Sequence, residues 1–410
     1  MRLLHTSDWH LGHSILSLSR EREHQAFLDW LVPVLDSEQI DALLITGDIF
    51  DTANPSGAAQ RLWYEFLERA HRLRPAMAIV VIGGNHDSAT RLDAPEPLLR
   101  AHNVHVVGGL PLDAAGQIDM DRLVIPLRDS GGAVRSWCAA VPFLRPCDLP
   151  VLREEGDPLK AGVEAIYRQA FAALRERRSE GQAMIATGHL YLSGSTISEL
   201  SERKILGGNL HALEGSLFPG DLAYAALGHL HLAQQVGGRP EVRYAGSPLP
   251  LSVGEAHYPH QVVVVELEGE RVAELRKLPV PRAVEFITLP EEGAASPEVL
   301  EQLIGDLAPR DDSVPIELRP FLHVRVTRRV PDHRSQLERL LEDRSPRLVT
   351  IKVVEDPACR AGAAAVEPRV LESLNEEEVF RRCYQERHGE APPDEVLRAF
   401  LELVAEAQHQ

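Results

Sequence analysis

Short apolar runs that end abruptly in polar, glycine-rich sequence recur along the first half of the chain. Each run has the length of a buried strand, and the stretches near 20–37 and 56–72 that separate the first runs have a helical period. Such alternation predicts a largely parallel sheet, in which the carboxyl ends of the strands open on one side and collect ligand-binding groups. The expected strands cover residues 2–8, 41–48, 78–87, 183–190 and 222–231.

The next part of the chain adds sheet without intervening helices. A helix is expected near 161–178, and strand-like segments follow at 242–246 and 261–269. Strands that follow one another without helices do not fit a single parallel sheet. The pattern therefore predicts an α/β fold in which two packed sheets form a sandwich flanked by helices.

A domain boundary is expected near Pro279, where the alternation starts again on a smaller scale. The segments that indicate a small α/β domain are strands at 284–289, 321–328 and 347–355 and helices near 297–307 and 332–343. Two amphipathic C-terminal helices are expected after an alanine-rich linker at 361–365, the second with Val396, Leu397 and Phe400 on one stripe. The predicted domains are residues 1–278, 279–358 and 359–410.

Residues with metal-binding side chains lie at the carboxyl ends of five expected strands. Taken singly, each has an ordinary explanation, such as a solvated loop, an aspartate at a turn or a hydrogen-bonded histidine. An alternating backbone would point Asp8 and His10 to the same side. Joint occurrence at one kind of position favours a metal centre, and mixed nitrogen and oxygen donors suit Mn²⁺, Fe or Zn²⁺ better than Mg²⁺ or Ca²⁺. The candidate ligands are Asp8, His10, Asp48, Asn85, His189, His229 and His231.

The net charge of −18, from 43 Lys and Arg against 61 Asp and Glu, has the wrong sign for a protein that coats nucleic acid by bulk charge. A polyanion would have to be held locally, by metal cations or by a basic partner. Neither an export signal nor an apolar run of about 20 residues is found, so a soluble, cytoplasmic protein without a membrane span is expected. The cysteines lie too far apart for a zinc knuckle or a disulfide framework and are expected to be reduced: Cys138, Cys147, Cys359 and Cys383.

In this order, the motifs D-x-H, G-D-x-x-D, G-N-H-D, G-H and G-H-x-H resemble those of the calcineurin-like metallophosphoesterase superfamily. The segments MRLLHTSDWHLGH, HQAFLDWL, GDIFDTANPS, AVPFLRP, IATGH, YAGSPLPLS and LNEEEVF are similar to the SbcD family, the nuclease subunits of bacterial SbcC-SbcD complexes. This likeness spans nearly the whole chain.

The resemblance assigns a role to each candidate residue. It implies one metal held by Asp8, His10, Asp48 and His231, and a second held by Asp48, Asn85, His189 and His229, with Asp48 as the bridge. His86 then faces the scissile phosphate, where it stabilises the transition state or protonates the leaving oxygen. Some relatives carry a histidine in place of Asp51, which leaves the role of this second catalytic candidate open, although it could orient His86.

The resemblance also implies an activity and partners. These are ATP-dependent 3'-5' exonuclease action on double-stranded ends and endonuclease action on single strands and hairpins, with two divalent metal ions, Mn²⁺ as the usual activator. The setting is DNA repair, replication and recombination. The partner is the SbcC ATPase, in a heterotetramer of two SbcC and two SbcD chains. A homodimer is implied, the small α/β domain caps the active-site cleft, and the terminal helices dock on SbcC.

Other functions remain open at this level. The metal motifs alone fit a phosphomonoesterase or a cyclic-nucleotide phosphodiesterase equally well, although the capping region and the terminal helices favour DNA. Those helices could instead form an intramolecular hairpin. A non-catalytic adaptor would have lost metal ligands, and here every ligand and His86 are present. Apolar positions such as Trp63 and Phe66 could belong to the core or to a dimer seam.

Overall fold

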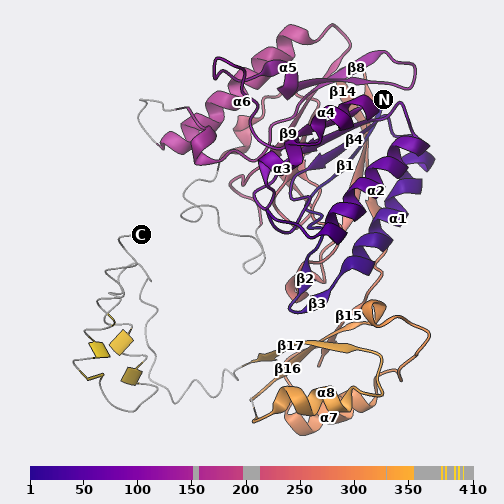
Figure 1. Cartoon of the computed structure of the whole chain (residues 1–410), viewed down its shortest axis with the longest axis vertical. Helices are drawn as coiled ribbons and strands as arrows, with labels where there is room; N and C mark the ends of the chain where they lie inside the picture. Colours follow the sequence, from indigo (N-terminus) through magenta and orange to yellow (C-terminus); the bar gives the residue numbers. More distant parts are fainter. Residues whose placement is uncertain are drawn as a thin grey trace. The chain divides into compact units, whose positions relative to one another are not determined.

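The computed structural model describes residues 1–150, 157–196, 213–328 and 330–354, together with single positions between 380 and 400. Residues Met1–Val353 form one compact unit and Val354–Gln410 a second. Two six-stranded sheets, β14-β13-β1-β4-β5-β6 and β11-β12-β10-β9-β8-β7, make up most of the first unit. Figure 1 shows helices on the outer sides of these sheets. The predicted sandwich of two sheets flanked by helices is confirmed.

The first sheet has a parallel centre and an antiparallel edge. Strands β1 to β6 of this sheet pair in parallel, as the sequence predicts, whereas β13 pairs antiparallel with β1 and β14 antiparallel with β13. The β13–β14 pair is a hairpin. The pattern of apolar residues does not indicate the direction of a strand, so the sequence does not predict this antiparallel edge. The strands are β1 (Arg2–Thr6), β4 (Ala42–Thr46), β5 (Ala78–Ile82), β6 (Val104–Val107), β13 (Gln261–Glu268) and β14 (Arg271–Pro279).

The second sheet repeats this plan, with β8, β9, β10 and β12 in parallel pairs and antiparallel strands at both edges. Its apolar inner face packs against that of the first sheet in one continuous core. The strands are β7 (Val124–Arg128), β8 (Val134–Ala139), β9 (Ala183–His189), β10 (Tyr224–Gly228), β11 (Gln234–Val236) and β12 (Arg239–Tyr244).

Three long helices cover the outer faces, at the positions that the helical period predicts. Helices α1 (Glu21–Ser37) and α2 (Gly57–Leu73) pack on the first sheet, and α6 (Pro158–Arg177) packs on the second. Trp63 and Phe66 of α2 are 2% and 0% exposed, and both rings contact Trp9. They therefore belong to the core of the chain itself. The short elements are β2 (Ser14–Ile15), β3 (Leu18–Ser19), α3 (Ala89–Asp93), α4 (Glu96–Leu99) and α5 (Met120–Leu123).

A three-stranded parallel sheet with its own core closes the first unit; we call residues 286–353 the small module. Its strands and helices fall where the sequence predicts them, and the predicted boundary near Pro279 stays a prediction. Leu300 and Ile304 of one helix and Leu337 of the other pack on the sheet. The elements are β15 (Phe286–Leu289), α7 (Pro297–Gly305), β16 (Phe321–Val326), α8 (His333–Leu340) and β17 (Arg347–Val353).

The expected linker at 361–365 and most of the two expected C-terminal helices, with Cys359 and Cys383, lie outside the described residues. Of the positions described there, Phe380 and Phe400 stack with ring centroids 4.2 Å apart. Cys138 is buried and Cys147 exposed, and both are free thiols. Among the described helices, none combines the length and the apolar character that a membrane crossing requires.

Gly228 of β10 packs tightly against β4 of the other sheet. A Cβ atom on Gly228 would lie 1.9 Å from the carbonyl oxygen of Thr46, a backbone atom that cannot rotate away. We predict that Gly228→Ala lowers the free energy of unfolding by about 1–3 kcal/mol, because overpacking forces the sheets apart. Urea denaturation measures this. Gly220→Ala, where a Cβ meets nothing within 4 Å, is the control and should change stability by less than about 0.5 kcal/mol; equal effects would contradict the account.

Candidate metal centre

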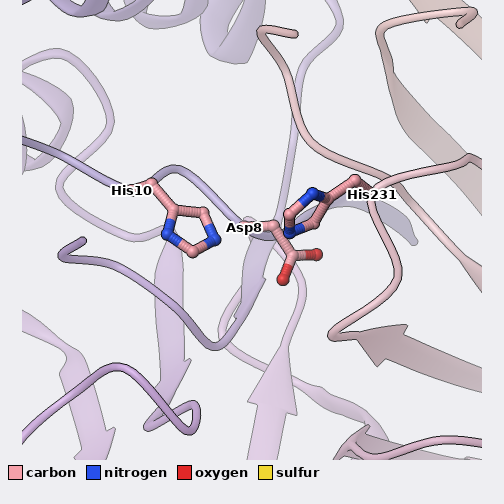
Figure 2. Close-up of side chains that lie close together, drawn as sticks. All are labelled: Asp8, His10 and His231. Carbon is pink, nitrogen blue, oxygen red and sulfur yellow. The ribbon is translucent and has the colours of Figure 1, made fainter. Parts of the chain in front are cut away.

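The predicted ligands come together at the carboxyl ends of β1, β4, β5, β9 and β10. Asp8, His10 and His231 each offer a donor atom within 4.8 Å of the other two, and Figure 2 shows these side chains around one point. Asp48, His189 and His229 form a second group on the same criterion. The structure thus gathers the two sets that the resemblance implies, although a ligand role for each residue stays a prediction.

Asn85 and Asp48 connect the second group and link it to the first. The Oδ1 atom of Asn85 lies 2.9 Å from Nε2 of His189 and 3.0 Å from Nδ1 of His229. The Oδ2 atom of Asp48 lies 3.3 Å from Nε2 of His189 and 3.6 Å from Nε2 of His10. Asp48 therefore stands between the two groups, where a bridging carboxylate would have to be.

Four of the gathered residues have left-handed backbone: Asp8 (φ 53°), His10 (φ 47°), Asp48 (φ 49°) and His229 (φ 96°). Side chains other than glycine rarely adopt this conformation, and it concentrates at functional sites. The expected alternation at Asp8 and His10 is therefore wrong. Strand β1 ends at Thr6, so a left-handed turn rather than strand alternation brings both side chains to the site.

Two glycines allow the backbone to approach the site closely. Gly47 has a φ of +92°, and a Cβ there would lie 2.2 Å from Nδ1 of His189. A Cβ on Gly84 would lie 2.1 Å from Oδ1 of Asp48. Only glycine leaves this space, so Gly47 before Asp48 and Gly84 before Asn85 have the same function.

Hydrogen bonds outside the gathered atoms orient the imidazoles and carboxylates. Nδ1 of His189 lies 2.9 Å from the carbonyl oxygen of Thr46, which can only accept, so Nδ1 donates and Nε2 is the ring nitrogen directed to the site. The Asp8 carboxylate accepts the backbone N–H of His229 at 2.9 Å, and Oδ1 of Asp48 accepts that of His86 at 2.9 Å.

Asp51 contacts two histidines through different atoms. Its carbonyl oxygen accepts a hydrogen bond from Nδ1 of His86 at 2.8 Å, whereas its carboxylate lies 3.3 Å from Nδ1 of His10. Any orientation of His86 by Asp51 thus acts through the backbone. His86 also brings a ring nitrogen within 4.8 Å of donor atoms of His10 and Asp48, so it lies beside both groups.

Sequence reasoning missed two buried carboxylates that support the site. Asp87 accepts the backbone N–H groups of Ile49, Phe50 and Gly84 at 2.9–3.1 Å, and so ties the loop after β5 to the loop after β4. Glu255 lies 3.1 Å from Nδ1 of His231. Asp87 stands inside the G-N-H-D motif, which is the one signal that could have found it, while the sequence around Glu255 gives none.

Burial and the Asp48 carboxylate set the proton affinities of the site. Burial lowers the pKa of His189, but the Asp48 carboxylate offsets it and raises the pKa to about 9. Burial, with the nearby His189, lowers the pKa of His229 to about 3. Burial disfavours the charged form of Asp48, yet the surrounding histidines hold its pKa well below the usual value. The carboxylate is thus ionised, and His189 is the group that shares positive charge with it.

The residues present fit divalent cations. His10 is 2% exposed, and its Nδ1 lies 3.3 Å from the Asp51 carboxylate, whereas its Nε2 makes no hydrogen bond within the part of the chain that the structure describes. A buried ring nitrogen without a hydrogen bond is unfavourable, and a cation at Nε2 would satisfy it. Together, the imidazoles, carboxylates and one amide oxygen match the donors that Mn²⁺, Fe and Zn²⁺ accept.

Proton competition at His189 makes cation binding depend on pH. Because the pKa of His189 is raised to about 9, this ring holds a proton at neutral pH that a cation must displace. We predict that Mn²⁺ affinity rises between pH 6 and 8, by up to about tenfold per pH unit for one released proton. Calorimetry in buffers of different ionisation enthalpy measures the release. An affinity that stays constant over this range would show that no proton is released on binding, and would contradict the raised pKa of His189.

Two regions of the chain match protein families. Residues 1–233 match the calcineurin-like phosphoesterases, and residues 282–388 match the type 5 capsule protein repressor C-terminal domain. The SbcD subunit of the SbcCD nuclease of Rhodobacter capsulatus is 42% identical over 392 residues, 94% of each chain. The SbcD subunits of Escherichia coli K12 and Bacillus subtilis 168 are 33% and 31% identical, over 93% and 100% of this chain and 92% and 99% of theirs. The chain therefore belongs to the calcineurin-like phosphoesterases and, within them, to the SbcD family.

Proposed function

We propose that this chain is the nuclease subunit of an SbcC-SbcD complex and hydrolyses DNA phosphodiester bonds at a centre of two divalent cations, with Mn²⁺ as the activator. The observation that carries the proposal is the position of Asp48 between two groups of imidazole, carboxylate and amide donors. The relatives, which are nuclease subunits matched over 92–99% of their own lengths, support the nuclease activity.

In the proposed centre, Asp8, His10, Asp48 and His231 hold one cation, and Asp48, Asn85, His189 and His229 hold the other. Two such cations supply a water of lowered pKa and offset the negative charge of the phosphodiester. The chain's own residues keep the donor atoms turned inward, as Thr46 does for His189 and Glu255 for His231. Burial of both groups excludes bulk water, which strengthens these electrostatic interactions.

His86 is the proposed catalytic residue. Its Nδ1 donates to the carbonyl oxygen of Asp51, so a protonated ring presents an Nε2–H that can donate to the scissile phosphate or to the leaving oxygen. Its backbone N–H donates to Oδ1 of Asp48, which fixes the ring beside the bridging carboxylate. Asp51 acts on catalysis by positioning His86 through its carbonyl oxygen and by contacting His10 through its carboxylate.

A chain with a net charge of −18 does not attract DNA by its overall charge, so the proposed cations and partner provide that attraction. DNA ends and hairpins are held by the cations and by the SbcC ATPase, in a heterotetramer of two copies of each subunit whose SbcD chains form a homodimer. Residues 359–410 bind SbcC, and the small module caps the cleft. With SbcC, the activities are ATP-dependent 3'-5' exonuclease action on double strands and endonuclease action on single strands and hairpins, in DNA repair, replication and recombination.

The test of this function is a Mn²⁺-dependent assay of the full chain on hairpin DNA and on end-blocked duplexes, with and without the ATPase partner. The expected result is metal-dependent cleavage of hairpins and an exonuclease activity on free ends that requires the partner and ATP. End-blocked duplexes should resist. A phosphomonoester or a cyclic nucleotide hydrolysed in preference to DNA would favour the rival phosphatase or cyclic-nucleotide phosphodiesterase.

Replacement of His86 separates chemistry from metal binding. We predict that His86→Ala retains both cations, because the ring is not a ligand, and loses at least about 100-fold in cleavage rate, because the proton donor is gone. Metal analysis and single-turnover cleavage measure the two effects. His102→Ala replaces an exposed histidine away from the site and should change neither. Loss of a cation from His86→Ala would make His86 a ligand instead.

A further inference from the structure

The short 3-10 helix η5 (Val253–Glu255) lies between the candidate metal centre and the small module. We infer that Glu255 is a positioning residue for His231. Through Glu255, the cation site of Asp8, His10 and His231 depends on the position of the small module. The inference rests on the binuclear centre proposed above. It adds a residue outside that centre and an asymmetry between its two cation sites.

On one side, Glu255 holds the imidazole of His231. The carboxylate is fully buried, and its Oε1 lies 3.1 Å from Nδ1 of His231. Its Oε2 accepts the backbone N–H of Leu251 at 2.8 Å, so the carboxylate is itself fixed on the backbone. A carboxylate that accepts the N–H of a ligand histidine sets the tautomer and the direction of the opposite nitrogen, and makes that nitrogen a better donor.

On the other side, η5 is attached to the small module. Arg282 donates from Nη2 to the carbonyl oxygen of Ala256 at 2.7 Å, and its guanidinium lies 5.9 Å from the ring centroid of Phe286 on β15. Val253 packs against a cluster that contains Phe321 and Val349 of the module. Val253 of η5 therefore contacts the module directly, and Ala256 after η5 is hydrogen-bonded to Arg282, which lies just before β15 in the chain.

The attachment continues into the module through aromatic and cationic groups. The rings of Phe286 and Phe321 lie 5.1 Å apart, and Phe321 is 1% exposed. The guanidiniums of Arg347 and Arg20 lie 4.5 Å and 6.0 Å from the Phe321 ring. Arg20 in turn is fully buried, forms a two-bonded ion pair with Glu23 and donates to the carbonyl oxygen of Pro250. The segment that carries Glu255 is thus fixed from Pro250 to Ala256.

The second cation site has no such attachment among the described residues. Its donors follow directly from β4, β5, β9 and β10, and His189 is fixed by the carbonyl oxygen of Thr46 within the sandwich. A change in the contacts between η5 and the module therefore shifts His231 through Glu255, whereas His189 keeps its position. The structure predicts that one cation site responds to the module and the other does not.

The test is a titration of the full chain with Mn²⁺ alone. Calorimetry measures the affinities, and electron paramagnetic resonance detects the spin coupling between two bound Mn²⁺ ions. Glu255→Ala should weaken one of two sites by about 10- to 100-fold, the range seen when the partner of a ligand histidine is removed, and leave the other within about twofold. Glu255→Gln should restore most of the affinity, because its amide oxygen can accept the same N–H. The matched control Glu96→Gln, at a buried glutamate paired with Arg100, should change neither site.

A second variant tests the attachment to the module without touching Glu255. Arg282→Ala should weaken the same site by a smaller factor, about three- to tenfold, because it removes a supporting contact one step further from the ligand. The matched control is Arg276→Ala. Arg276 lies on β14, the edge strand of its sheet, and pairs with Glu38. A thermal melt of each variant confirms folding. Loss of both sites in equal measure, or an unchanged Arg282→Ala, would overturn the inference.

The outcomes for the inference and for the proposed function differ. Wild-type protein that binds fewer than two Mn²⁺ ions would contradict the binuclear centre itself. Wild-type protein that binds two, with Glu255→Ala and Arg282→Ala indistinguishable from it, would leave the centre intact and refute the role of Glu255.

Discussion

The arrangement of the site depends on the buried carboxylate of Asp48. It is 2% exposed at the junction of the two sheets, and a carboxylate in that position is stable only where donors or cations surround it. One oxygen accepts the backbone N–H of His86, and the other faces His10 and His189. The other ring nitrogen of His189 contacts the carbonyl oxygen of Thr46, and that of His10 contacts the carboxylate of Asp51. This single charge favours the convergence of many donors on one point, where the proposed cations would offset it.

The architecture stabilises a local geometry that would be unfavourable by itself. Four residues of the site have left-handed backbone, each at a cost of about 1–3 kcal/mol. The strands that precede them are almost entirely buried and pack in one core across both sheets, so the turns cannot relax without disrupting that core. Glycines at 47, 84 and 228 leave the space that the closest approaches need. The rigid sandwich thereby holds the donors ready for cations before they bind.

Much of the fold and most of the site follow from the sequence, because apolar strands and their polar ends obey simple periodicity. What escaped prediction depends on tertiary packing. Asp87 and Glu255 act through partners brought close by the fold, and nothing in the residues around Glu255 marks its contact with His231. The direction of β13 and the use of the Asp51 carbonyl oxygen rather than its carboxylate are likewise properties of the folded chain. The terminal segment expected to bind the ATPase lies mostly outside the described residues.

If Asp48 bridges two cations, anomalous diffraction from crystals soaked in Mn²⁺ will show two peaks, one on each side of the Asp48 carboxylate. One should be bounded by Asp8, His10 and His231, and the other by Asn85, His189 and His229. A single peak, or two peaks that do not share Asp48, would show that Asp48 is not a bridging ligand.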